Sequence, residues 1–191
     1  MSSAVLQPAI VMAAFWLALA LHQRRDPAHT PRFAASLLVG AAATHLGWIV
    51  CFSPEIGWRA LDLAGASVLF LPLGPLLCAR SAASFASLPL PIALSRLGCL
   101  ASGCCRGDMG VLLPLLDGVA FVLLDRLCRG LPDRKVGSAF LGGFGAIRLA
   151  ETPWRTSVDS FALASPSLVA SGWIFFAAAV VARDRNRVTN R

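Results

Sequence analysis

The sequence predicts an all-α membrane protein with about seven transmembrane helices, organised as a single transmembrane domain over residues 1–191. Of its residues, 57% are hydrophobic and only 14% are charged, whereas soluble domains carry about 25% charged residues. A helix needs about 20 mainly apolar residues to cross a bilayer, so a chain of 191 residues holds several spans with short loops. No hydrophilic stretch is long enough to form a separate soluble domain.

Seven apolar runs account for this prediction, of which the fourth is irregular and the sixth is short. They extend approximately over Val5 to Leu21, Phe33 to Phe52, Ala60 to Cys78, Ser84 to Gly103, Val111 to Leu127, Gly137 to Glu151 and Pro166 to Ala182. The first run lacks the preceding basic residues and the cleavage site of a signal peptide. We therefore expect it to be retained as a span.

The basic residues predict the orientation, because cytoplasmic loops of membrane proteins are enriched in Lys and Arg. If the loop at 22–32 is cytoplasmic, that side holds 12 basic residues and the opposite side holds three. This asymmetry predicts an outside N-terminus and a cytoplasmic C-terminus. The net charge of +7 lies mostly in these short loops, so anionic lipid is the expected partner and nucleic acid is not.

Two arginines, Arg96 and Arg148, fall inside apolar runs. A buried arginine in a bilayer costs from about 3 to more than 10 kcal/mol, and such residues usually face a polar cavity or a partner. Alternatively, both arginines extend to the lipid headgroups or form structural ion pairs. Glu151 follows Arg148 by one helical turn and either orients it or accepts a proton. Asp117 either pairs with an arginine or lies near the outer interface.

Two patterns surround these arginines. The first is LPLPIALSRLGCLASGCCRGDMG at 88–110, which is dense in glycine and cysteine. Small residues allow backbones to approach closely and suit irregular backbone that lines a cavity. The second is FGAIR at 144–148, followed by Glu151.

These patterns resemble the signature regions of the bacterial prolipoprotein diacylglyceryl transferases. The first is similar to an Arg-x-Gly-Asn-Phe-x-Asn-x-Glu-x-x-Gly stretch, with matches at Arg96, Gly98 and Gly107. The second is similar to Tyr-Gly-x-x-Arg followed by Glu, with Phe144 in place of the tyrosine. The resemblance covers about residues 60–182. The family's seven spans and its orientation agree with those predicted above.

The resemblance implies a transferase of the bacterial plasma membrane that moves diacylglyceryl from phosphatidylglycerol to the cysteine thiol of a lipoprotein precursor. Phosphatidylglycerol and the precursor's signal peptide are then the partners, and no cofactor or metal is expected. The catalytic residues would be Arg96, Arg148 and Glu151, because guanidinium groups chelate phosphate and stabilise a departing phosphate ester. The substrate-binding positions would be Gly98, Cys99, Gly103, Cys104, Gly107 and Gly145.

The sequence departs from the family at several polar positions. Cys99 and Cys104 stand where the family has an asparagine and an acidic residue, and LFLPL at 69–73 stands where it has His-Gly-Gly. These departures favour a second hypothesis, a phospholipid-binding or scaffold protein without catalysis. His45 in the second run either replaces the missing histidine as general base or is bonded to a backbone carbonyl.

The cysteines at 99, 104 and 105 carry a third hypothesis, a membrane thiol or redox protein. Thiolates need positive neighbours, which Arg96 and Arg106 supply. Alternatively, these small side chains pack a tight turn. His22 and His29, in the loop at 22–32, are expected to be solvated.

Overall fold

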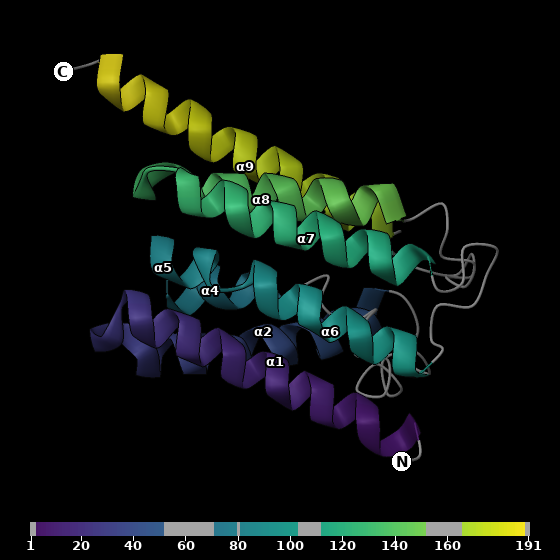
Figure 1. The fold of residues 1–191 in the computed structure, drawn as a ribbon. Helices are drawn as coiled ribbons and strands as arrows, with labels where there is room; N and C mark the ends of the chain where they lie inside the picture. The colour runs from purple at the N-terminus through teal and green to yellow at the C-terminus, as the bar shows by residue number, and fades with distance from the viewer. Residues whose placement is uncertain (1–2, 52–70, 80, 103–111, 152–165, 190–191) are drawn as a thin grey trace.

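The chain forms a bundle of helices that lie side by side (Figure 1). The computed structural model describes residues 3–51, 71–79, 81–102, 112–151 and 166–189. Over these residues the backbone is helical apart from short turns. The predicted all-α class is confirmed for this part of the chain.

Five long helices coincide with five of the predicted apolar runs. They are α1 (Ser3–Arg25), α2 (Thr30–Cys51), α7 (Leu112–Gly130), α8 (Asp133–Glu151) and α9 (Pro166–Thr189). A 3-10 helix, η1 (Pro27–His29), joins α1 to α2. Of the third run, the structure describes α4 (Leu73–Cys78), and residues 52–70 lie outside the described part.

The irregular fourth run is divided into α5 (Ala82–Ala86) and α6 (Pro89–Ser102). Ser81 caps α5, because its hydroxyl accepts a hydrogen bond of 3.1 Å from the backbone N–H of Ser84. Pro89 starts α6, a position where the missing proline N–H costs nothing. Since proline also disfavours helical geometry in the residue before it, one continuous helix does not form here.

Packing joins these helices in a defined order. Helix α6 packs against both α1 and α7, helix α8 packs against α7 and α9, and α2 packs against α4. Gly74 of α4 lies so close to α2 that a Cβ added there would be 1.9 Å from the carbonyl oxygen of Ser36. Among the described residues, no helix combines the length and the apolar character that crossing a membrane requires.

A run of aromatic rings forms the centre of the core. Phe140 lies 5.8 Å from both Phe85 and Phe144, and Phe144 lies 6.0 Å from Phe121, measured between ring centroids. Phe121, Phe140 and Phe144 are fully buried. Such tilted aromatic pairs contribute about 0.5–1.5 kcal/mol each beyond their buried area. The run connects α5, α7 and α8 along the bundle axis.

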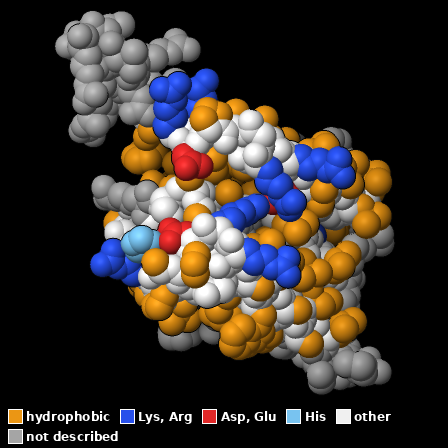
Figure 2. Space-filling model, turned by 60° about the vertical axis from the view of Figure 1, so that its left-hand side comes forward, with side chains coloured by type: hydrophobic (Ala, Val, Ile, Leu, Met, Phe, Trp, Pro, Cys, Tyr) orange, Lys and Arg blue, Asp and Glu red, His pale blue; other side chains and the backbone are white. Residues whose placement is uncertain are grey.

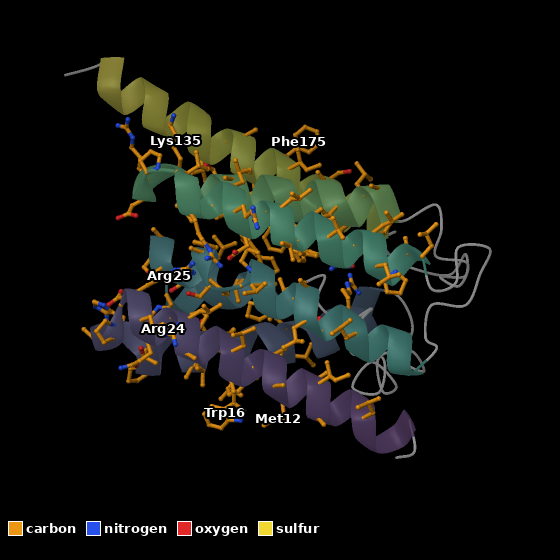
Figure 3. All side chains as sticks on the ribbon, in the orientation of Figure 1. Met12, Trp16, Arg24, Arg25, Lys135 and Phe175 are labelled. Carbon is orange, nitrogen blue, oxygen red and sulfur yellow. The ribbon has the colours of Figure 1, made fainter. Side chains whose placement is uncertain are left out.

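The basic residues of two connections gather at one end of the bundle. Arg24 and Arg25 of α1 lie at the same end as Lys135 of α8 (Figure 3), and Figure 2 shows Lys and Arg side chains clustered there. We call this the basic end and define it by Arg24, Arg25, Arg126, Arg129, Arg134 and Lys135. The sequence predicts that the loops carrying these residues lie on one side. In the structure these loops lie at one end of the bundle.

Candidate functional site

Four charged side chains meet inside the bundle. Arg96 comes from α6, Asp117 from α7, and Arg148 and Glu151 from α8. None of the four is more than 6% exposed. We call them the charge cluster.

Both carboxylates of the charge cluster contact both arginines. Arg148 Nη1 donates to Glu151 Oε2 at 2.7 Å, and Arg96 Nη2 donates to Glu151 Oε1 at 3.2 Å. The Nε of Arg96 forms an ion pair with Asp117 Oδ2, and Arg148 Nη1 lies 3.6 Å from that same oxygen. The cluster is therefore a closed ring of alternating charges that links three helices.

Helical spacing and aromatic packing position Arg148. Its partner Glu151 follows at i+3, and Phe144 precedes it at i−4, so all three side chains share one face of α8. The guanidinium carbon lies 5.1 Å from the ring centroid of Phe121 and 5.3 Å from that of Phe144. Cation–π attraction of this kind is worth about 0.5–2 kcal/mol. The aromatic core thus ends directly against the charge cluster.

The charges of the cluster cancel, because two arginines meet two carboxylates. Ion pairs are strong in a low dielectric, but removing both charges from water costs nearly as much as the pairing returns. An incoming anion would have to compete with Asp117 and Glu151 for the guanidinium groups. The four-residue cluster is consequently neutral as a whole, and its arginines are not a free positive site.

The cluster lies near the ends of its helices. Arg96 is in the last two turns of α6, Asp117 is in the second turn of α7, and Glu151 is the last residue of α8. After α6 and α8 the chain runs through residues 103–111 and 152–165, which lie outside the described part of the chain.

The structure brings together the three predicted catalytic residues and adds Asp117. Of the two alternatives for Asp117, pairing with an arginine is the one observed. Glu151 orients Arg148, as an ion pair one turn away predicts. The contact between Glu151 and Arg96 was not predicted, since α6 and α8 are distant in sequence and no local spacing signals their approach.

The predicted substrate-binding positions fall into two groups, those that the structure describes, Gly98 and Gly145, and those that it does not. Gly98 is buried on α6. Gly145 faces α9, where an added Cβ would lie 2.6 Å from the carbonyl oxygen of Ala170. This close helix contact accounts for the glycine without a substrate. The Cys99 side chain, together with residues Gly103, Cys104, Cys105 and Gly107, lies outside the described residues.

Metal binding has no support in the described part of the chain, where no three His, Cys, Asp or Glu side chains gather closely enough to hold an ion. Two cysteines are described there as free thiols, Cys78 at the surface and Cys128 in the interior. Burial raises the pKa of Cys128 to about 11. This thiol is protonated at neutral pH and is therefore a poor nucleophile. The side chain of His45 lies outside the described residues.

The expectation that His22 is solvated is wrong. Its side chain is fully buried and stacks on Phe33 at 4.2 Å between ring centroids. Its Nδ1 lies 3.4 Å from the Thr30 hydroxyl and its Nε2 lies 3.3 Å from the Ser84 hydroxyl. His22 lies in the last turn of α1, just before the chain reverses, and the start of α2 folds back over it. His29 is 53% exposed, as expected.

Comparison of this chain with protein families, curated proteins and solved structures found no match. The resemblance to the diacylglyceryl transferases therefore stays a prediction.

Breaking the charge cluster should be costly, and restoring its neutrality should recover stability. We expect Glu151→Gln to lower the free energy of unfolding by about 3–5 kcal/mol, because it leaves a buried positive charge. The double variant Arg148→Met/Glu151→Gln again pairs one arginine with one carboxylate and should lose less. Denaturant titration followed by circular dichroism measures both. Arg126→Gln, at an exposed position of α7, is the control. Additive losses in the double variant would contradict the closed ring.

Acid should destabilise the fold through His22. Burial lowers its pKa below the ordinary value of 6.5, so the unfolded chain binds the proton more readily than the folded chain does. The contribution of neutral His22 to stability is fully present above pH 6.5 and is lost as the pH falls below that value. The melting temperature should drop between about pH 7.5 and about pH 5.5. His22→Gln should flatten this slope and His29→Gln should preserve it. Equal slopes in all three proteins would rule out His22 as the cause.

Proposed function

We propose that the protein is a multi-pass protein of the bacterial plasma membrane that binds the phosphate of an anionic phospholipid, phosphatidylglycerol, at the charge cluster. The observation that carries this proposal is the convergence of Arg96 and Arg148, from two helices, on a shared pair of carboxylates. Arginine binds phosphate and carboxylate oxygens in the same forked geometry. A lipid phosphate can therefore take the place of one carboxylate on the two guanidinium groups.

The outer surface of the bundle supports a lipid environment. Met12, Trp16 and Phe175 point away from the bundle (Figure 3) and are 52%, 62% and 75% exposed. Other exposed large apolar side chains include Leu38, Leu46, Leu97, Leu116, Val119, Leu123 and Leu127. Soluble monomers rarely expose so much apolar surface. The basic end gives the same support, since Lys and Arg collect on the cytoplasmic side of membrane proteins.

The contacts of Glu151 favour an exchange of partners. Its two oxygens hold both arginines, at 2.7 and 3.2 Å, so it can release one guanidinium and keep the other. Asp117 balances the remaining charge. Because the phosphate diester brings one negative charge, the cluster stays neutral only when one carboxylate moves out of it, which avoids the large cost of an uncompensated buried charge.

A second candidate function, diacylglyceryl transfer, follows from the same carboxylate. Glu151 would accept the proton of a substrate cysteine thiol while the sulfur forms a bond to the glycerol carbon of the lipid. The bond from that carbon to the phosphate oxygen breaks, and glycerol 1-phosphate leaves with the bonding electrons. The two arginines would stabilise the negative charge on the departing phosphate.

Lipid affinity should respond in opposite directions to the two kinds of cluster residue. Arg148→Lys keeps the charge but loses the fork, and should weaken phosphatidylglycerol binding by about tenfold. Asp117→Asn and Glu151→Gln remove a competing carboxylate and should strengthen binding by a similar factor. Equilibrium binding of fluorescent phosphatidylglycerol to detergent-solubilised, folded protein measures this. Arg126→Gln is the control. Unchanged affinity in all cluster variants would identify the ring as a purely structural ion network.

Transfer is tested with labelled phosphatidylglycerol and a precursor peptide that carries the acceptor cysteine. We expect a thioether product from the wild-type protein and none from Glu151→Gln, although that variant still binds lipid. A product that survives Glu151→Gln contradicts its role as base. If Cys104→Ser abolished the product and substitutions of Arg96 and Arg148 did not, the thiol hypothesis would instead be favoured.

A further inference from the structure

A second polar site lies at the basic end, far along the bundle from the charge cluster. A pocket of about 480 Å³ opens between the end of α1, helix α5 and the turn from α7 to α8. This volume is within the range of about 300–1,000 Å³ that is usual for sites that bind small molecules. The polar residues that line it are Arg25, Asp26, Ser81, Arg129 and Asp133.

Both arginines of the pocket contact other groups of the protein, and the Arg129 side chain is 52% exposed. Arg25 donates through Nη1 to the carbonyl oxygen of Ala86 and, at 3.2 Å, to the hydroxyl of Ser87. Arg129 forms an ion pair with Asp125, which is only 3% exposed. Within the described part of the chain, these contacts use one nitrogen of each guanidinium, so the remaining N–H groups are available to a ligand. A fixed guanidinium binds an oxyanion with little loss of side-chain entropy.

Two carboxylates and a hydroxyl complete the lining. Asp26 accepts a hydrogen bond of 2.8 Å from His29 through Oδ1, which leaves Oδ2 for a ligand. Asp133 begins α8 on the other side of the pocket. The Ser81 hydroxyl is fixed by the Ser84 hydroxyl at 2.8 Å, which in turn lies 3.3 Å from His22 Nε2. Carboxylate and hydroxyl oxygens accept hydrogen bonds from an ammonium group.

The balance of charge decides the class of ligand. The lining carries two guanidinium groups and two carboxylates, and Asp125 already neutralises part of the charge of Arg129. A plain anion would meet the two aspartates, and a plain cation would meet the two arginines. A zwitterion satisfies both sets of groups.

We infer that this pocket binds a small zwitterionic phosphate ester, with the phosphate on Arg25 and Arg129 and the ammonium on Asp26 and Asp133. The chemistry is that of phosphoethanolamine, either free or as the headgroup of phosphatidylethanolamine. Side chains on the pocket floor, such as Ala83, Ala86 and Val136, are small and apolar, which suits a short carbon chain between the two charges. This inference does not depend on lipid binding at the charge cluster.

The test compares the zwitterion with its two halves. Calorimetric titration of the full-length protein in detergent with phosphoethanolamine, inorganic phosphate and ethanolamine should show phosphoethanolamine binding at least about tenfold more tightly than either half. Equal affinity for phosphoethanolamine and phosphate, or no binding of phosphoethanolamine, would overturn the inference.

Three variants locate the site. Arg129→Gln should weaken phosphoethanolamine binding by about tenfold or more. Asp133→Asn should weaken phosphoethanolamine binding and leave phosphate binding unchanged. Arg126→Gln is the matched control, because Arg126 is exposed on the same helix but does not line the pocket. If Arg126→Gln and Arg129→Gln weakened phosphoethanolamine binding equally, the binding would depend only on the general charge of the basic end, and the inference would be overturned.

Two further measurements separate the sources of the ligand and the two sites. In lipid discs of phosphatidylglycerol, added phosphatidylethanolamine should compete with soluble phosphoethanolamine if the headgroup is the ligand. Absence of competition, with soluble binding retained, assigns the site to the free phosphate ester. Arg148→Lys should leave phosphoethanolamine affinity unchanged. A failure of lipid binding at the charge cluster can therefore be distinguished from a failure of phosphoethanolamine binding at the pocket. If Arg148→Lys lowered the affinity for phosphatidylglycerol and for phosphoethanolamine in parallel, this would contradict a separate pocket.

Discussion

The cost of burying two arginines in an apolar bundle is the constraint on which the rest of the structure depends. A guanidinium cannot lose its proton under ordinary conditions, so Arg96 and Arg148 must be neutralised where they lie. Asp117 and Glu151 meet this requirement by contacting both arginines at once. As a result α6, α7 and α8 are joined at one point by ion pairs.

The aromatic core and the charge cluster support each other. Phe121 and Phe144 pack in the core and also place their rings near the guanidinium of Arg148, at 5.1 and 5.3 Å. The same rings exclude water from the ion pairs, which strengthens the pairs and raises the cost of breaking them. Replacing an aromatic residue here would therefore affect both the core and the charges.

Polar chemistry is divided between two places with different physical characters. At the charge cluster every side chain is buried, and the binding that we propose there requires exchange with a carboxylate. At the basic end the pocket is already open, and its arginines contact Ala86, Ser87 and Asp125. The first place suits an anion that replaces an internal partner, and the second suits a zwitterion that adds to a balanced lining. The partners of each arginine set this difference, because an arginine that is paired with a carboxylate is not a free anion site.

The sequence by itself determined the helical class, the approximate bounds of the described helices, the collection of basic loops on one side and the unusual status of Arg96 and Arg148. These features follow from hydropathy and local spacing, which act over one or two helical turns. The pair of Arg148 and Glu151 was predictable for the same reason, since the two residues are one turn apart. Only the tertiary structure decided that Glu151 also reaches Arg96, that Asp117 closes the ring, and that His22 is buried under the start of α2. Those contacts join different helices, and their formation depends on how the helices pack, which no local pattern specifies.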